Sequence, residues 1–435
     1  MTEPELSVIV IVYNMAREAP RTLQSLAVGY QQHIEQHEYE VIVVDNGSNP
    51  PLDPAILNRL PGNFRLLRID PAPPSPCHAV NRGLEIARGE IVGVLEDGAR
   101  LATPGLLHFA RSGVRLYRHA FVATMGWYLG SDFQSYSILA GYNATEEDAL
   151  LESIAWPTDG YRLFEVSTPD EASVNGWFAG VHSSSAVTAE STGLFLRREV
   201  WQELGGYDER FDFPGGGMCD FDIYYRALAI PDMHLVVLTG EGTFHQLHGG
   251  VSTNTAPDTF NDKIKWLTQY LSLRGRIDAP VLQHPPTYIG TWTRSALIPF
   301  VLQSIDPVRV APMTPVGPSF DLWTWPDAVP PSADRTIAML VELMHAEFRA
   351  GRYDAVAAVA RIARMYAPRE PEPLRILRRF APYCDERAMR RHKRSAQFHL
   401  AVGKAYDLTG QPDKATEAFN AARAAERELR PAVAR

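Results

Sequence analysis

Short apolar runs rich in β-branched residues alternate with amphipathic segments over residues 5–100, and this alternation is the strongest constraint on the fold. The runs that predict strands are Leu6 to Val12, Tyr39 to Val44, Phe64 to Ile69 and Glu90 to Leu95. Helices are predicted at about Glu18 to Tyr30 and Cys77 to Ala87. Strands that alternate with helices are typical of a parallel sheet covered by helices. The sequence therefore predicts an α/β domain with a mostly parallel central sheet.

Acidic residues stand where two of these strands end. Asp45 precedes Asn-Gly-Ser, and Glu96 and Asp97 precede Gly98. Ligands of open parallel sheets bind outside the carboxyl ends of the strands, so these carboxylates are candidate site residues. A plainer interpretation is that they only begin turns, as Asp often does after a strand. The surrounding segments favour the functional interpretation.

The composition indicates a folded protein of more than one domain. The chain has 435 residues, with 45% hydrophobic and 21% charged residues. A single core rarely grows beyond about 250–300 residues, so two or three domains are expected. The formal net charge of -9 disfavours a general nucleic-acid binder, which needs a basic surface. No nucleic-acid partner is therefore predicted.

The cysteines and the N-terminus favour a cytoplasmic protein. Cys77, Cys219 and Cys384 are widely spaced and give neither a disulfide framework nor zinc-ligand spacing. Acidic residues stand at the N-terminus, where a signal peptide needs basic ones. Apolar runs fall short of the about 18 residues that indicate a membrane span. We expect a chain that is neither secreted nor membrane-spanning.

The rest of the chain divides by its pattern. Residues 116–187 lack sustained periodicity; their aromatic residues fit either core packing or acceptor stacking, and they include Trp127, Tyr128, Trp156 and Trp177. Residues 256–332 are rich in proline and are expected to form an extension and linker. The predicted domains are therefore 1–255, 256–332 and 333–435.

The C-terminal part, residues 333–435, is helical by its period and weakly repetitive. Several residues fall at tetratricopeptide spacings: Gly403, Tyr406, Gly410, Ala415, Phe419 and Ala422, with Gly351, Ala363 and Pro368 upstream. Such all-α modules bind protein partners or self-associate. A basic cluster from Arg387 to Arg394 fits a solvated helix face or peripheral contact with an anionic membrane.

The sequence resembles the family 2 glycosyltransferases over roughly residues 5–255. The segments that carry the resemblance are LSVIVIVYN with VVDNGS, then AVNRGLEIARGEIVGVLEDGA, then STGLFLRREVWQELGGYDERF, and GGGMCDFDIYYRA with GTFHQLHGG. No single segment is decisive, but four segments in the family's order make a strong signal. The resemblance implies a GT-A fold and a hexosyltransferase of polysaccharide biosynthesis.

The resemblance also implies a nucleotide-sugar donor site. Asp45 would contact the nucleobase, with Tyr13 and Asn14 lining the same site. Asn81, in the second segment, is assigned to donor binding as well, and Glu96 would face the ribose. A UDP-sugar is the expected donor, and a glycan or lipid-linked hydroxyl is the expected acceptor.

The remaining residues implied by the resemblance carry the chemistry. Asp97 would ligate Mn²⁺ or Mg²⁺, with His245 or His248 completing the metal site. Asp220 would deprotonate the acceptor hydroxyl, so that attack inverts the anomeric centre. Near it, Asp222 is interpreted as either a helix cap or a site residue.

Two departures from the family pattern leave a second function open. Gly98 stands where the metal-binding motif usually has its third carboxylate, and Cys219 replaces the usual Glu before the base. The alternative is a scaffold protein that acts through its helical repeats. A nucleotidyltransferase is disfavoured because no glycine-rich phosphate loop follows the first strand.

Overall fold

The computed structural model describes residues 3–130, 134–169, 193–250, 260–277, 282–284, 287–290 and 396–433. The chain forms two compact units. One contains residues 1–297 and 398–419, and the other contains residues 298–397 and 420–435. The sheet and the candidate site belong to the first unit. The predicted domain boundaries at 255 and 332 remain predictions.

A mixed sheet forms the centre of the first unit. Its strands are β1 (Leu6–Val12), β2 (Tyr39–Asp45), β3 (Phe64–Arg68), β4 (Ile91–Leu95), β5 (Arg100–Ala102), β6 (Ala120–Leu129), β7 (Ser167–Pro169), β8 (Leu194–Arg197), β9 (His234–His245) and β10 (Thr287–Ile289). The order is β10-β9-β6-β8-β4-β1-β2-β3, while β5 pairs with β9 and β7 with β6. Along this path only β8 runs antiparallel to its neighbours. The predicted α/β class with a mostly parallel sheet is confirmed.

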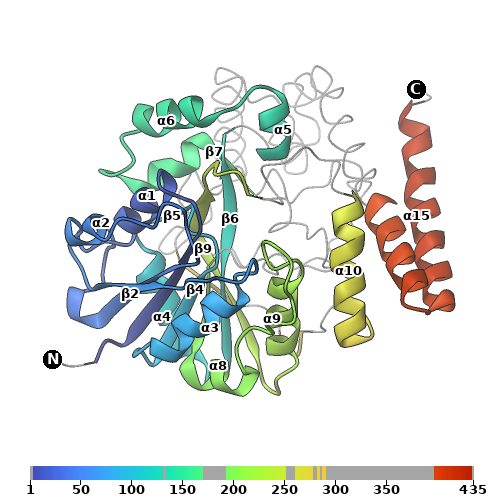
Figure 1. Ribbon diagram of the computed structural model, residues 1–435, viewed down its shortest axis with the longest axis horizontal. Helices are drawn as coiled ribbons and strands as arrows, with labels where there is room; N and C mark the ends of the chain where they lie inside the picture. Colours follow the sequence, from blue (N-terminus) through green and yellow to red (C-terminus); the bar gives the residue numbers. More distant parts are fainter. Residues whose placement is uncertain are drawn as a thin grey trace, which may run out of the picture. The chain divides into compact units, whose positions relative to one another are not determined.

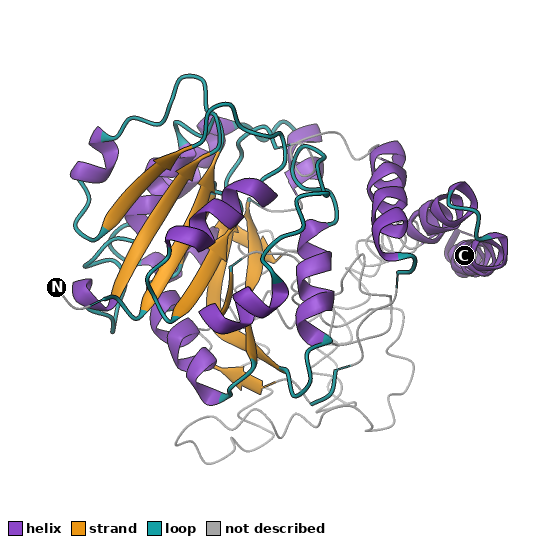
Figure 2. Ribbon diagram, turned by 60° about the horizontal axis from the view of Figure 1, so that its bottom comes forward, coloured by secondary structure: helices purple, strands orange, loops and turns teal. Residues whose placement is uncertain are grey.

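Helices cover both faces of this sheet (Figures 1 and 2). The described helices are α1 (Glu18–Ser25), α2 (Ala55–Asn58), α3 (Cys77–Ile86), α4 (Leu106–Leu116), α5 (Gln134–Leu139), α6 (Ala144–Ser153), α8 (Arg198–Leu204), α9 (Cys219–Leu228), α10 (Phe260–Arg274) and α15 (Pro412–Val433), with 3-10 helices at Gln36–Glu38 and Gly160–Val166. Among the described residues, no helix is both long enough and apolar enough to cross a membrane.

The alternation of side chains along β1 builds two cores, one on each face of the sheet. Val8 and Val10 pack with residues of α1 and α4 on one face. Ile9 and Ile11 pack with residues of α3, α8 and α9 on the other. A strand buried on both faces reads as a continuous apolar run, which is why β1 is visible in the sequence.

The predicted N-terminal strands agree with β1 to β4 to within about a residue at each end. By contrast, β6, α5 and α6 lie in the stretch 116–187, which has no periodic hydrophobic pattern. All ten residues of β6 are buried, so no polar residue alternates with its apolar ones. Trp127, Tyr128 and Trp156 are buried, which agrees with the core interpretation, and Trp177 lies outside the described residues.

The described C-terminal residues form helical residues 396–408 followed by α15. A Cβ atom at Gly403 would lie 2.5 Å from the Phe419 ring, so glycine allows the close approach that the repeat spacing predicts. The OH of Tyr406 accepts a hydrogen bond from the backbone N–H of Ile277 (3.3 Å). The tetratricopeptide-like assignment stays a prediction, since Gly351, Ala363, Pro368 and the basic cluster lie outside the described residues.

Glu241 is a buried carboxyl group at an irregularity in β9. The pairing of β6 with β9 shifts register there, from Thr124 with Leu238 to Met125 with Gly242. The hydroxyl of Tyr161 donates to Glu241 (2.9 Å), and the hydroxyl of Thr103 donates to its other oxygen. Burial raises the pKa of Glu241 from 4.5 to about 7, against these hydrogen bonds, which lower it.

This raised pKa predicts how stability changes with pH. Between pH 4.5 and 7 the folded chain keeps the Glu241 proton that the unfolded chain releases, so stability falls as pH rises. Relative to Glu241→Gln, the native chain should lose about 2–3 kcal/mol of unfolding free energy between about pH 5 and 8. Urea denaturation at both pH values measures this, with Glu152→Gln, an exposed glutamate, as control. Parallel pH profiles for native chain and Glu241→Gln would contradict it.

Candidate active site

The sequence-predicted donor residues lie at one edge of the sheet. β2, β1 and β4 are parallel neighbours, so their carboxyl ends meet there. Tyr13 and Asn14 follow β1, Asp45 ends β2, and Glu96 follows β4. The ends of strands on the same edge form the crevice in which α/β proteins bind ligands.

Asp45 is buried and strongly hydrogen bonded. Its carboxylate accepts from the backbone N–H groups of Ser48 (2.8 Å) and Leu52 (3.0 Å) and pairs with Arg68 (2.7 Å). Burial alone would raise the pKa of Asp45, but these hydrogen bonds outweigh burial and lower it. Asp45 therefore stays ionised and shapes the loop after β2, as the turn interpretation predicts. Its contact with a nucleobase remains a prediction.

Asn14 ties the end of β1 to this loop. Its backbone N–H donates to the Ser48 hydroxyl (2.9 Å), and its side-chain oxygen accepts from the Asn49 N–H (2.8 Å). It has a left-handed backbone with φ of 54°, which Asn tolerates better than most residues. The neighbouring Tyr13 is 56% exposed, so its ring is available to a ligand.

Asn81 lies on α3 and holds the turn after α8. Its side-chain amide donates to the Tyr207 carbonyl (2.9 Å) and to Glu209 (2.9 Å), and its oxygen accepts from the Tyr207 N–H (2.9 Å). These hydrogen bonds join α3 to the turn after α8. Its predicted role in donor binding remains a prediction, and its present contacts explain the residue structurally.

Pairing of β5 with β9 brings the predicted metal ligands together. In this antiparallel pair Arg100 lies opposite His245, and the Gln246 N–H donates to the Ala99 carbonyl (2.8 Å). Asp97, just before β5, consequently lies 2.8 Å from His245 Nε2 and 3.5 Å from His248 Nε2. The two histidine Nε2 atoms are 3.1 Å apart. One carboxylate and both candidate histidines therefore converge.

Gln134, on α5, fixes the orientation of the His245 ring. Its amide nitrogen donates to the His245 carbonyl (2.9 Å), so its oxygen faces His245 Nδ1 at 2.6 Å. Nδ1 therefore carries the hydrogen, and Nε2 points its lone pair at Asp97. Metal-ligating histidines are commonly held in this way through their second nitrogen.

The protonation of this cluster fits a bound cation. Burial lowers the pKa of His245 to about 4, so its Nε2 is unprotonated near neutral pH. Burial alone would raise the pKa of Asp97, but His248 and His245 hold it well below its usual range. A carboxylate and an imidazole lone pair then face each other at 2.8 Å. Such a pair needs a positive charge beside it. Burial alone would lower the pKa of His248, but Asp97 raises it, and Arg100 lies 3.7 Å from Asp97. A bound cation is a further candidate for this charge.

Gly98 explains why the third carboxylate of the family motif is missing. A Cβ atom at this position would lie 2.6 Å from the Ile11 carbonyl oxygen and 2.9 Å from Val12 Cγ2. No side chain fits there without a shift of β1. Among the described residues, the atoms near this position that could ligate a metal are those of Asp97, His245 and His248.

A second cluster lies beside the first. Atoms of Glu96, Cys219 and Asp220 that could ligate a metal lie within 4.8 Å of one another, and the Cys219 thiol is 3.4 Å from Glu96. Burial and the charge of Asp220 raise the pKa of Glu96 well above its usual range. Glu96 is therefore harder to ionise than an exposed glutamate. Its predicted contact with a ribose remains a prediction; its carboxyl group lies beside Asp220.

The two clusters share one strand end. Glu96 and Asp97 are consecutive residues after β4, and each reaches a different cluster. Asp220 lies in the first turn of α9, whereas Asp222 is buried and pairs with Arg226 (2.7 Å) and Arg274 (2.5 Å). This placement makes Asp222 a structural residue, and it leaves Asp220 as the carboxylate of α9 at the site.

Residues 7–99 match the family model of glycosyl transferase family 2. The match includes Asp45, Glu96 and Asp97, and it ends before Asp220, His245 and His248. It thus covers the donor half of the constellation and agrees with the resemblance stated from the sequence motifs.

Crystal structures of residues 1–349 of S. aureus TarS are among the similar solved structures. The structure without a named ligand is 16% identical with a TM-score of 0.40, the UDP complex 14% with 0.41, and the UDP-GlcNAc complex 15% with 0.42. Each alignment covers 96% of this chain and 91% of the TarS chain. A search of the curated proteins finds no match.

Sequence reasoning missed the residues that hold the site together. Arg68, Gln134, Arg17 and Glu147 all contact predicted site residues or the segment between them. Gln134 and Glu147 lie in the stretch without periodicity, and nothing in their local sequence marks them. Only the pairing of distant segments identifies them.

Proposed function

We propose that this protein is a metal-dependent glycosyltransferase that moves a hexose from a nucleotide-diphosphate sugar to a hydroxyl group of a glycan or lipid-linked acceptor, with inversion. The observation that carries the proposal is the convergence of Asp97, His245 and His248 beside the Glu96–Asp220 cluster. The family match over residues 7–99 supports the same activity.

Asp97, His245 and His248 would hold a divalent cation, which would neutralise charge on the departing diphosphate when bound. Two imidazole nitrogens favour Mn²⁺ over Mg²⁺, because Mg²⁺ prefers oxygen ligands. Asp220 acts as the general base and takes the proton of the attacking acceptor hydroxyl. Tyr13, Asn14 and Asp45 form the nucleoside end of the donor site, with a UDP-sugar as the expected donor.

Nucleotide binding tests this proposal directly. Calorimetry with UDP, GDP and their common sugar conjugates, with and without Mn²⁺, should reveal one nucleotide whose binding depends on the metal. Asp97→Ala should abolish the metal-dependent part of that binding, because the only carboxylate of the metal cluster is lost. Asp407→Ala, an exposed position on helical residues 396–408, is the control and should bind as the native chain does.

Failure to bind any of these nucleotides would contradict the proposal. The scaffold alternative, in which the C-terminal helices carry the function through a protein partner or self-association, would then be favoured. Binding that is equal with and without Mn²⁺ would retain the nucleotide site and reject the metal.

A further inference from the structure

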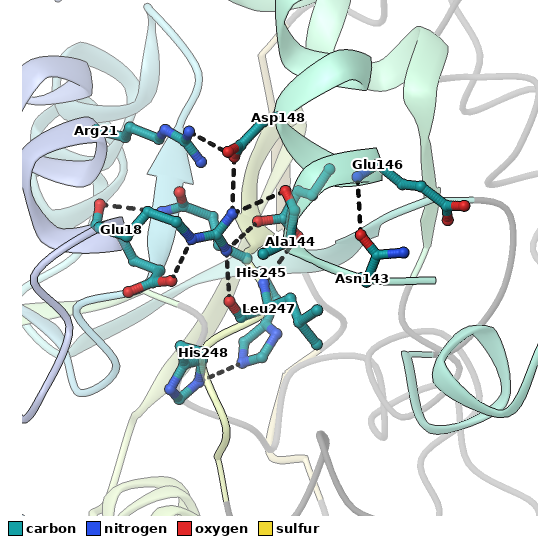
Figure 3. A network of polar contacts seen from close by, with 12 residues as sticks. Glu18, Arg21, Asn143, Ala144, Glu146, Asp148, His245, Leu247 and His248 are labelled. Carbon is teal, nitrogen blue, oxygen red and sulfur yellow. Dashed lines mark hydrogen bonds and ion pairs between the residues drawn. The ribbon is translucent and has the colours of Figure 1, made fainter. Parts of the chain in front are cut away.

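Leu247 lies between the two candidate metal-binding histidines, and one ion pair binds both its main-chain N–H and its main-chain carbonyl. Its carbonyl accepts from Arg17 Nη2 (2.6 Å), and its N–H donates to Glu147 Oε2 (2.8 Å). Arg17 and Glu147 also bond to each other (2.8 Å). Figure 3 shows the surrounding network, with Leu247 beside His245 and His248. Arg17, Glu147 and the main chain of Leu247 therefore form a closed ring of hydrogen bonds.

This ring joins three segments that are distant in the sequence. Arg17 directly precedes α1, Glu147 lies on α6, and Leu247 follows β9. Arg17 reaches α6 again through Asp148 (2.8 Å) and the Ala144 carbonyl (3.2 Å). The loop after β9 is therefore tied to elements on both sides.

Glu147 occupies a costly position. Its side chain is 0% exposed, whereas that of Arg17 is 27% exposed. A carboxylate is buried at a large desolvation cost unless partners satisfy it. The partners of Glu147 include the backbone N–H of Leu247, so the buried carboxylate binds the loop after β9 as well as Arg17. A pair that served only to join α1 and α6 would not need that contact.

We propose that Arg17 and Glu147 are positioning residues for the metal site. They fix the main chain at Leu247 and thereby set the separation of His245 and His248. His245 is held separately through Gln134, and Leu247 directly precedes His248. The inference rests on the proposed function, because it requires that the Asp97 cluster binds a cation.

Binding of Mn²⁺ alone, without nucleotide or acceptor, tests the inference. Free Mn²⁺ followed by electron paramagnetic resonance gives the affinity, and thermal unfolding of each protein identifies the temperature at which it is folded. Glu147→Ala, measured while folded, should weaken Mn²⁺ binding about 10–100-fold, the usual effect of removing a group that orients a metal ligand.

Asp148→Ala is the matched control. It removes the adjacent carboxylate on α6, which contacts the same arginine and not Leu247. Its Mn²⁺ affinity should stay within about twofold of native. Arg17→Lys keeps the charge at a partly exposed position and replaces the fork of donors with one ammonium group. It should weaken Mn²⁺ binding as well, and it serves as the second variant if Glu147→Ala does not fold.

The possible results separate the two proposals. Native Mn²⁺ affinity in a folded Glu147→Ala, or in Arg17→Lys where the first variant does not fold, overturns the inference and leaves the proposed function intact. Equal weakening in Asp148→Ala also overturns it, because the effect would then follow the α1–α6 contact. A native chain that binds no Mn²⁺ overturns the inference and rejects the metal in the proposed function, while the nucleotide calorimetry still tests the donor site.

Discussion

Asp220→Asn should reduce the rate of sugar transfer about 10³-fold, within the range that general-base catalysis contributes. The amide keeps the shape of the carboxylate but cannot take a proton from the acceptor hydroxyl. Metal binding should stay native, since Asp220 lies in the Glu96 cluster and the predicted metal ligands form the other. A steady-state assay with the nucleotide identified by calorimetry would therefore show a loss in kcat.

Glu199→Gln is the control for this change, because Glu199 is an exposed carboxylate on the neighbouring helix α8. It should transfer sugar at the native rate. If Asp220→Asn kept native kcat, Asp220 would not be the base, and the proton would have to be taken by another group.

Asp222→Ala should lower the free energy of unfolding by about 3–5 kcal/mol, the cost of removing one partner from a buried ion pair. Asp222 is 1% exposed and lies between Arg226 and Arg274, so Arg226 would lose its carboxylate and Arg274 would keep only its ion pair with Asp208. Arg226 also donates to the Leu204 and Gly206 carbonyls, so Asp222 helps to hold the arginine that joins α9 to the turn after α8.

Urea denaturation of Asp222→Ala and of Asp262→Ala measures this effect. Asp262 forms an ion pair with Lys265 in which both side chains are at least half exposed, so its removal should cost about 1 kcal/mol or less. Equal stability of the two variants would show that the Asp222 pairs contribute no more than a surface ion pair.

Much of the fold could be predicted because its signals are local. β1 and β2 are continuous apolar runs that end at turn-forming residues, so their positions follow from the sequence alone. β6 lacks such a signal, since its buried residues include small and aromatic ones and its pairing with β9 is interrupted by a register shift. Long-range pairing decides that part of the sheet.

The sequence predicts the residues of the candidate site better than it predicts the contacts between them. The position of Asp97 after a strand indicates a ligand by local pattern, and resemblance adds the histidines. The contact of Asp97 with these histidines depends on the register of β5 with β9, which no local sequence pattern indicates. The contacts of Gln134 with His245 are similarly non-local. Residues that position other site residues therefore cannot be predicted from local sequence patterns.

Because Glu96 and Asp97 are consecutive, the spacing between the Glu96 cluster and the Asp97 cluster is tied to a covalent step. Adjacent Cα atoms are about 3.8 Å apart whatever the surroundings do. Surface loops could diverge over evolution and alter which acceptor is admitted, while this interval stays the same. An insertion between Glu96 and Asp97 would be the exception, since it would separate the two carboxyl groups. We expect that short segment to tolerate neither a change in length nor a side chain at Gly98.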